Sequence, residues 1–355
     1  MLRTVISATG RHIPSVRVPN DHFLDRDFRD ANQRPLGKTN EEIVQQFEAI
    51  TGIRERRWAP PELVTTDLAT DAAQEALDSS RLDPESLDGI IVAHNFGDVR
   101  TSRPAPDQVP AIAARVKSRL GIHNPSTVAF DLIFGCPGWL QGVILADSMI
   151  RAGDAHRVMI IGADTLSRIS DPHDRDSLIY ADGAGAVIVE GRETDGGVLA
   201  RAVRSDTLEH ASMLFMGASY HPERFLEALF LKMEGRSVYK YALNTVAGAM
   251  KEALDRAGLD VRDVKKILIH QANGKMDEAI LSKFYELYEI SPAPQEVMPM
   301  TISWLGNSSV ATVPTMLDLI LKGEMPDHRI EPGDIVLFAS VGAGMHINAV
   351  VYRWI

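Results

Sequence analysis

The amino-acid sequence repeats itself at long range. Residues 75–92 read EALDSSRLDPESLDGIIV and residues 252–269 read EALDRAGLDVRDVKKILI, so the two copies share EALD, then LD, then an isoleucine at the same spacing. Each copy predicts the end of an amphipathic helix, a turn and a short β-branched strand. A helix–loop–strand unit that occurs twice indicates a chain built from two similar α/β halves.

Two further correspondences extend the repeat. FGCPGWLQGVILADSMIRAGD, from Phe134, aligns with LGNSSVATVPTMLDLILKGE, from Leu305, and the strand-like HRVMIIGAD, from His156, aligns with DIVLFASVGAG, from Asp334. We therefore expect an α/β duplication with residues 1–195 and 196–355 as its halves. Strands that alternate with helices predict mostly parallel, buried sheets. A short strand is also expected around residues 298–303.

Composition excludes several functional classes. The 355 residues contain no apolar run near the roughly 20 residues that cross a bilayer, and the N-terminus lacks a secretory signal pattern, so we expect a cytoplasmic protein without membrane insertion. The formal net charge of -11 argues against nucleic-acid binding. A single cysteine excludes an intrachain disulfide and a Cys-pair metal site, and neither a metal nor a bound cofactor is expected.

Three loops are the candidates for a functional site. In open α/β sheets, ligands bind beyond the carboxyl ends of the strands. Cys136 follows the strand-like VAFDLIF, His270 follows KKILI, and Asn307 is expected to open a helix. Because Cys136 and Asn307 occupy equivalent places in the two halves, the sequence predicts one site between the halves.

The setting of Cys136 suits a nucleophile. It lies between Gly135 and Pro137, and proline is favoured in the first turn of a helix. Free N–H groups and the helix dipole at a helix N-terminus favour the thiolate, which is the nucleophilic form. The alternative is a buried structural cysteine, and the local sequence alone leaves both open.

His270 and Asn307 also have structural alternatives, as a strand-end histidine and as a helix cap. Together with Cys136 they have a chemical logic. A Cys thiolate can attack an acyl thioester, and the oxyanion can be held by the backbone N–H of Cys136 and by a second N–H from the Gly-rich turn SVGAGMH, most simply that of Ala343. His270 and Asn307 can donate hydrogen bonds to the enolate left when a malonyl thioester loses carbon dioxide.

In these segments the chain resembles the ketoacyl-acyl-carrier-protein synthase III family of the thiolase superfamily. The resemblance is carried by TGIRERRW from Thr51, the Cys136 segment, SRISDPHDRDSLIYADGAGAVIV from Ser167, HQANGK from His270 and GNSSVATVP from Gly306. It covers nearly the whole chain, and the ordered Cys, His-Gln-Ala-Asn and Gly-Asn-Ser-Ser series is its most specific part.

The resemblance implies a five-layered αβαβα fold, a homodimer and decarboxylative Claisen condensation of an acyl primer with malonyl-acyl-carrier protein, in fatty-acid initiation or in a specialised lipid or polyketide pathway. Cys136 would carry the acyl group, His270 and Asn307 would assist condensation, and the N–H groups of Cys136 and Ala343 would form the oxyanion hole. The substrates would be acyl-carrier-protein or coenzyme A thioesters. A basic patch for the acidic carrier protein would fall on Lys240, Lys275 and Lys283.

The sequence departs from the family pattern around the substrate. Gln46 and Ile50 stand where members have the Trp and Arg that sandwich the adenine of coenzyme A, so this contact is not carried over. The loop that reaches the partner's acyl pocket is longer than in the family and ends on Val109 in place of a bulky aromatic residue. Phe134 and Met345 also differ from the usual residues, with His346 beside them. These changes predict an altered acyl pocket and a longer acyl chain.

Three alternatives remain at this point. A non-decarboxylating condensing enzyme of the hydroxymethylglutaryl-coenzyme A synthase type needs a carboxylate near the thiol, for which Glu48 or Asp98 are candidates. A catalytically silent partner subunit would not need Cys, His and Asn together. A Cys-His hydrolase would need His270 to pair directly with Cys136.

Overall fold

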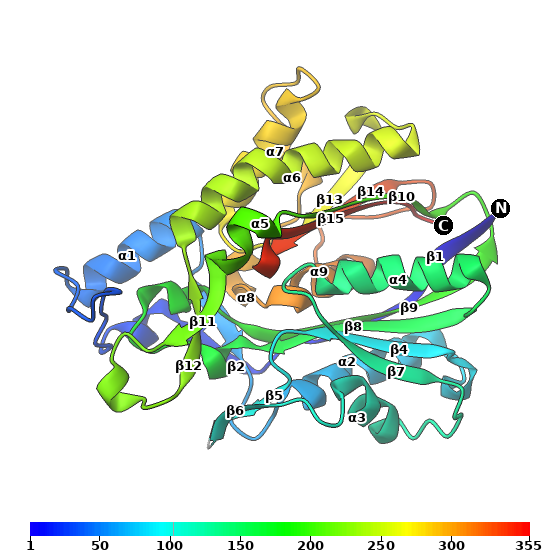
Figure 1. The fold of residues 1–355 in the computed structure, drawn as a ribbon. Coiled ribbons are helices and arrows are strands. Elements are labelled where there is room, and N and C mark those ends of the chain that lie inside the picture. Colours follow the sequence, from blue (N-terminus) through cyan, green and yellow to red (C-terminus); the bar gives the residue numbers. More distant parts are fainter. Residues whose placement is uncertain (102) are drawn as a thin grey trace.

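The computed structural model describes residues 1–101 and 103–355, and its main helices and strands stack in five layers (Figure 1). Two helices cover the outer face of the first sheet, two lie between the sheets, and two cover the outer face of the second sheet. The five-layered αβαβα prediction is therefore confirmed.

The two main sheets have five and four strands in the part of the chain that the structure describes. The first has the order β1-β9-β8-β4-β7, with the bounds β1 (Leu2–His12), β4 (Gly89–His94), β7 (Val128–Ile133), β8 (Arg157–Thr165) and β9 (Asp182–Glu193). The second has the order β10-β15-β14-β13, with the bounds β10 (Gly197–Ser205), β13 (Val264–Ile269), β14 (Ile335–Gly342) and β15 (His346–Arg353).

The prediction of mostly parallel sheets is wrong. Only the β4/β7, β4/β8 and β13/β14 pairs are parallel among the described residues, whereas β1/β9, β8/β9, β10/β15 and β14/β15 are antiparallel. Parallel neighbours need a long crossover. β8 and β9 are joined by residues 166–181, which form only short 3-10 turns, and β14 and β15 by a tight turn, so these strands return antiparallel.

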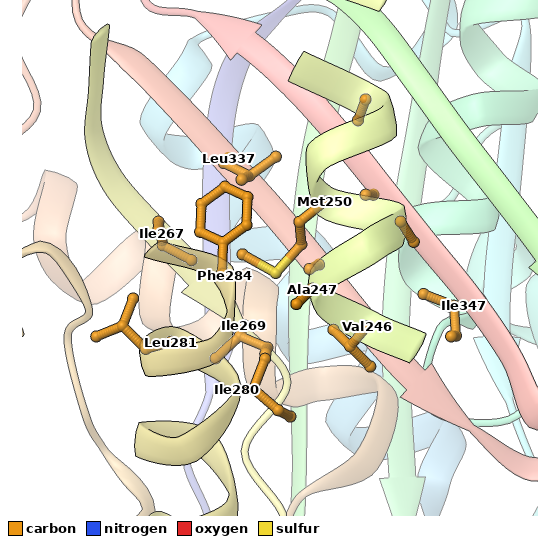
Figure 2. Packing of buried hydrophobic residues seen from close by; sticks show 14 of the residues in the cluster. Val246, Ala247, Met250, Ile267, Ile269, Ile280, Leu281, Phe284, Leu337 and Ile347 are labelled. Carbon is orange, nitrogen blue, oxygen red and sulfur yellow. The ribbon is translucent and has the colours of Figure 1, made fainter. Parts of the chain in front are cut away.

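Helices fill the spaces around and between the sheets. The helices of the five layers are α2 (Thr65–Ser80) and α3 (Ile112–Arg119) on the first sheet, α4 (Gly138–Ala152) and α9 (Thr312–Leu321) between the sheets, and α6 (Gly235–Ala257) and α7 (Gly274–Glu286) on the second sheet. In Figure 2, Met250 of α6 and Phe284 of α7 pack against Leu337 of β14. All nine residues of α9 from Thr312 to Ile320 are buried, as expected for a central layer.

The duplicated unit is observed in both halves. α2, a 3-10 turn and β4 form the first copy, and α6, a 3-10 turn and β13 form the second. The strands of the first sheet come from residues 2–193 and those of the second from residues 197–353.

The short strand expected at residues 298–303 is absent from the described structure, and α8 (Ile302–Leu305) forms there instead. The buried Gln271 side chain explains the difference. Its amide nitrogen donates to the Pro299 carbonyl at 2.7 Å, and its oxygen accepts the N–H groups of Thr301 and Ile302 at 2.8 and 3.0 Å. The Gln271 side chain thus forms the hydrogen bonds with the backbone of this segment that a neighbouring strand would otherwise form.

Smaller elements complete the fold. They are α1 (Asn40–Thr51), α5 (Thr207–His210), and the two-stranded pairs β2 (Val16–Pro19) with β3 (Glu55–Trp58), β5 (Asp98–Arg100) with β6 (Arg103–Asp107), and β11 (Leu214–Ala218) with β12 (Leu229–Met233). None of the helices described here combines the length and apolar character that crossing a membrane requires.

Candidate active site

Cys136 lies in the loop between β7 and α4. The helix starts at Gly138 with Pro137 at its N-cap, so the thiol precedes the first turn as the sequence predicts. Close backbone packing joins this loop to the turn after β14. A Cβ on Gly135 would lie 2.8 Å from the Ala343 nitrogen, and one on Gly342 would lie 2.6 Å from the Cys136 nitrogen. Glycine at both positions therefore lets the backbones of Cys136 and Ala343 approach each other.

The thiol is not stabilised as a thiolate in the resting protein. Burial raises the pKa of Cys136 to about 11, a hydrogen bond from Ser309 works against the rise, and the Asp164 charge adds to it. The expected effect of the helix N-terminus is thus outweighed by desolvation. Cys136 carries its proton at neutral pH and must lose it when it reacts.

Asn307 lies two residues before a 3-10 turn, Ser309–Ala311, that leads directly into α9 at Thr312, so it precedes the helical segment without being its cap residue. Asn307 also forms an isolated bridge with Tyr180: its N–H donates to the Ile179 carbonyl at 2.9 Å, and its carbonyl accepts the Ala181 N–H at 2.8 Å. Its side-chain Oδ1 accepts the Ser309 N–H at 2.8 Å. The amide oxygen is thereby fixed, which leaves Nδ2 as a donor for a ligand.

His270 follows β13 directly, and its N–H donates to the Ala339 carbonyl of β14 at 2.9 Å. The side chain is 3% exposed. Burial lowers the pKa of His270 to about 4, although a hydrogen bond to the Ser309 backbone favours the charged form. The imidazole is therefore neutral at pH 7, with one N–H that can donate.

Ser309 connects the three predicted residues, and sequence reasoning did not identify it. Its hydroxyl lies 3.5 Å from Cys136 Sγ, its N–H donates to Asn307, and its backbone bonds to His270. Its φ of 55° is in the left-handed region, which is uncommon for a residue with a side chain and is concentrated at functional sites. The Gly-Asn-Ser-Ser motif marks the segment, but no sequence pattern marks this backbone angle.

A buried carboxylate lies behind Ser309. Asp164, at the end of β8, is 1% exposed and accepts both the N–H and the side-chain Nδ2 of Asn95, at 2.9 and 2.6 Å. The same Nδ2 donates to the Ser309 hydroxyl at 2.9 Å. Burial raises the pKa of Asp164 to about 6. Neither Asp164 nor Asn95 was predicted, because only the fold shows that the ends of β4 and β8 lie beneath Ser309.

The three predicted acyl-pocket residues have different surroundings. Phe134 stacks on His346, with ring centroids 4.2 Å apart and an interplanar angle of 16°, and His346 in turn bonds to the Ser205 hydroxyl at 2.8 Å. Met345 is fully buried in the cluster of α6, α7 and the second sheet, so the structure assigns it to the core and it offers no free surface to an acyl chain. Val109 is 87% exposed.

Val109 lines a surface cavity of about 410 Å³ formed around β5 and β6, and no residue of the Cys136 loop is among those that line it. Its contact with a partner's acyl pocket stays a prediction. Residue 102 of the long loop lies outside the described residues. The three lysines predicted for carrier docking are all exposed, with Lys240 on α6 and Lys275 and Lys283 on the neighbouring α7.

The two acidic residues considered as bases are engaged elsewhere. Glu48 is exposed on α1 and accepts from the Asn20 amide at 3.0 Å. Asp98 is buried and accepts from the N–H and hydroxyl of Thr66 and from Arg115, each at 2.7 Å. Within residues 1–101 and 103–355, no group of three His, Cys, Asp or Glu side chains could hold a metal ion.

Comparison with known proteins gives matches along the whole chain. The family profile described as 3-Oxoacyl-[acyl-carrier-protein (ACP)] synthase III matches residues 130–207, and its C-terminal counterpart matches residues 254–354. A beta-ketoacyl-[acyl-carrier-protein] synthase III of Erythrobacter litoralis (strain HTCC2594) is 32% identical over 100% of both chains, and one of Bradyrhizobium sp. (strain BTAi1 / ATCC BAA-1182) is 33% identical over 99% of both.

Among solved structures, 3-oxoacyl-(acyl carrier protein) synthase III from Pseudomonas aeruginosa PAO1 superposes with a TM-score of 0.82 at 28% identity, covering 99% of this chain and 98% of that one. The corresponding enzyme from Thermus thermophilus gives a TM-score of 0.79 at 31% identity, covering 99% of each chain.

Proposed function

Because the chain belongs to the 3-oxoacyl-[acyl-carrier-protein] synthase III family of acyltransferases, we propose that it condenses an acyl group carried on Cys136 with malonyl-acyl-carrier protein. The observation that supports this most is the convergence on Ser309, which contacts Cys136, His270 and Asn307. We also propose that the enzyme acts in the cytoplasm as a homodimer.

The first step is acyl transfer. The Cys136 sulfur attacks the carbonyl carbon of an acyl thioester, the carbonyl oxygen becomes negative, and the bond to the donor sulfur then breaks. The backbones of Cys136 and Ala343 lie side by side through the close approach at Gly135 and Gly342, which supports their N–H groups as the oxyanion hole.

The second step is decarboxylative condensation. Loss of carbon dioxide from the malonyl thioester leaves an enolate, whose carbon attacks the acyl group on Cys136 and frees the thiol. A neutral His270 suits this step, because its N–H can donate to the enolate oxygen while it leaves no charged group buried in the resting site. Asn307 is suited as the second donor because Ser309 already occupies its amide oxygen.

The carrier protein would approach over α6 and α7. This protein has a net charge of -11, so an acidic partner needs a local basic surface. Lys240, Lys275 and Lys283 are exposed on these two adjacent helices, and they are the positions that the family resemblance implies. We propose that they form this surface.

A non-decarboxylating condensation is less well supported. It needs a carboxylate that reaches the substrate, and Asp98 is already engaged by Thr66 and Arg115. Asp164 lies near the thiol, but it is 1% exposed behind Ser309.

The proposal is tested by separating the two steps. The protein is incubated with acetyl-, hexanoyl- and decanoyl-coenzyme A and with the matching acyl-carrier-protein thioesters, and its intact mass is measured. We expect one acyl group per chain with at least one donor and none on Cys136→Ala. His270→Ala and Asn307→Ala should still be acylated but should release carbon dioxide from malonyl-acyl-carrier protein at least about 100-fold more slowly. Equal acylation of Cys136→Ala would refute the nucleophile, and unchanged carbon dioxide release would refute the two donors.

A further inference from the structure

The Cys136 thiol is joined to a buried carboxylate by hydrogen bonds. Ser309 Oγ lies 3.5 Å from Sγ, Asn95 Nδ2 donates to Ser309 Oγ at 2.9 Å, and the same nitrogen donates to Asp164 Oδ2 at 2.6 Å. One amide nitrogen thus holds the Ser309 hydroxyl and the Asp164 carboxylate next to each other. The condensing chemistry described above assigns no role to Asn95 or Asp164.

Several independent features of the fold hold this arrangement together. Asn95 and Asp164 follow β4 and end β8, which are parallel neighbours, so their side chains meet at one sheet edge. The Ser309 segment is pressed onto β8 at Gly162, where a Cβ would overlap the Val310 carbonyl. Ser309 itself adopts a φ of 55°, a strained conformation that persists only when the surroundings impose it.

The Ser309 hydroxyl is suited to pass on a proton. A hydroxyl has one proton to donate and can accept two hydrogen bonds. Because Asn95 donates to Ser309 Oγ, the hydroxyl proton is available to the Cys136 sulfur, to which it donates at 3.5 Å, or to the carboxylate of Asp164, which the same amide holds beside it. Moving that proton from one partner to the other connects the thiol to the carboxylate.

We propose that Ser309 and Asp164 form a proton relay that removes the thiol proton of Cys136 as the sulfur attacks its acyl donor. Ser309 is the catalytic residue because it touches the sulfur, and Asp164 is a positioning residue that acts through Ser309. The relay rests on the proposed function, since it serves the acylation step.

The proton and the electrons balance in this step. The S–H proton passes to Ser309 Oγ while the proton of Ser309 passes to the Asp164 carboxylate, and the sulfur electron pair forms the bond to the carbonyl carbon. When the bond to the donor sulfur breaks, the proton held by Asp164 returns by the same route, and the donor leaves as a thiol. Asp164 and Ser309 are then restored.

The acid–base properties of the groups fit a relay that acts during attack. With a pKa of about 6, Asp164 is ionised at pH 7.5 and can accept a proton, whereas burial holds the thiol pKa at about 11. Complete transfer is therefore unfavourable in the resting enzyme and becomes favourable only as the sulfur loses its basicity by bonding to carbon. His270, with a pKa of about 4, is a weaker base than Asp164.

Among the described residues, the titratable groups close to the relay include Cys136 before α4, His270 after β13, His94 at the end of β4 and Tyr180 after the 3-10 turn of residues 175–179. Burial raises the pKa of Tyr180 well above its ordinary value, so its hydroxyl stays neutral over the pH range of the experiment. His94 Nδ1 accepts the Gly97 N–H at 3.0 Å, which places its proton on Nε2, 2.9 Å from Asp131. The Nε2 of His94 is thus bonded to Asp131. Because His94 also lies near Asp164, it needs a control variant.

The experiment measures the rate of Cys136 acylation by an acyl-coenzyme A between pH 5 and 8, by intact mass after rapid quenching. The wild-type rate should fall below about pH 6, where Asp164 becomes protonated. Asp164→Asn should acylate about 100-fold more slowly at pH 7.5 and lose the fall near pH 6, because the amide cannot accept the proton. Ser309→Gly should show the same two effects, and glycine removes the hydroxyl while relaxing the left-handed backbone.

Two variants serve as controls. His94→Gln should keep the fall near pH 6, which excludes His94 as its origin. Asp182→Asn changes a buried carboxylate of the same sheet, bonded to Ser167 and Ala59, and should leave the pH profile unchanged. A wild-type rate or an unchanged pH profile in Asp164→Asn would overturn the relay.

A failure of the proposed function is distinguishable from a failure of the relay. If no acyl donor modifies the wild-type protein, the proposed function is wrong. The relay is then tested by iodoacetamide alkylation of Cys136, whose rate should still rise above pH 6 in the wild type and not in Asp164→Asn. If donors acylate the wild type and both relay variants alike, the proposed function stands and the relay is refuted.

Discussion

At the scale of single residues, the neutral state of His270 makes stability depend on pH. The folded-state pKa of about 4 lies below the ordinary value of 6.5, so the unfolded chain binds a proton between these values and the folded chain does not. The contribution of His270 to the free energy of unfolding is therefore constant above pH 6.5, and it becomes destabilising as the pH falls toward 4.

We expect wild-type protein to lose about 2–3 kcal/mol more stability between pH 7 and pH 4.5 than His270→Gln, from roughly 1.4 kcal/mol per unit of pKa difference. The measurement is urea unfolding of both proteins at the two pH values and one protein concentration. An equal loss in both would show that His270 is not held neutral. Other acidic and basic groups are shared by the two proteins and cancel in the comparison.

Sequence reasoning identified some site residues and missed others for physical reasons. Cys136, His270 and Asn307 follow predicted strands within specific motifs, and the structure brings all three onto Ser309. Ser309 was missed because its position in the site depends on a left-handed φ, and the amino-acid type does not predict this backbone conformation. Asp164 depends on which strands become neighbours, and this is decided by packing between segments far apart in the chain.

At the scale of elements, the contact between the Ser309 segment and β8 sets the site geometry. Gly162→Ala would add a methyl group where the Val310 carbonyl lies, so the segment must move away from β8. We expect at least about a tenfold loss of Cys136 acylation and a loss of about 1–3 kcal/mol in stability.

The matched control is Gly248→Ala on α6, where a Cβ would meet no atom within 4 Å. It should keep full activity and gain up to about 1 kcal/mol, because alanine favours a helix. Acylation rates and thermal unfolding of both variants check this pair. Full activity in Gly162→Ala would show that the site tolerates displacement of the segment.

Helices and strands could be predicted from the sequence where the local hydrophobic pattern determines the secondary structure. The two helix–loop–strand copies formed as expected because their periodicity matches their structure. The expected strand at residues 298–303 failed because the Gln271 side chain takes its backbone groups, and a propensity argument cannot foresee a partner 30 residues away. The prediction of mostly parallel strands was wrong for a similar reason. The relative direction of two strands depends on the length and structure of the segment that connects them.

At the scale of the whole molecule, β7 forms an edge of the first sheet, next to β4. Its ends carry exposed apolar side chains, with Val128 57% and Ile133 61% exposed. Exposed edge strands of this kind pair readily with a second chain. This edge supports the proposed homodimer, in which the sheets of two protomers would join at β7.

We expect Ile133→Lys to convert a dimer into a monomer, because joining the sheets at β7 would bury the lysine's charge without a partner. Light scattering after size-exclusion chromatography measures the mass against 39.0 kDa for one chain. Leu208→Lys, at a residue 97% exposed on α5, is the control and should stay dimeric. A monomeric wild-type protein, or a dimer unaffected by Ile133→Lys, would reject this interface.

The protonated state of Cys136 also bears on how the protein survives oxidants. Peroxide attacks thiolates far faster than thiols, and a thiol with a pKa of about 11 offers almost no thiolate at neutral pH. The chain has no second cysteine to form a disulfide with a sulfenic acid and so repair the damage. Keeping the sulfur protonated until a substrate arrives therefore protects a nucleophile whose oxidation the protein could not reverse by itself.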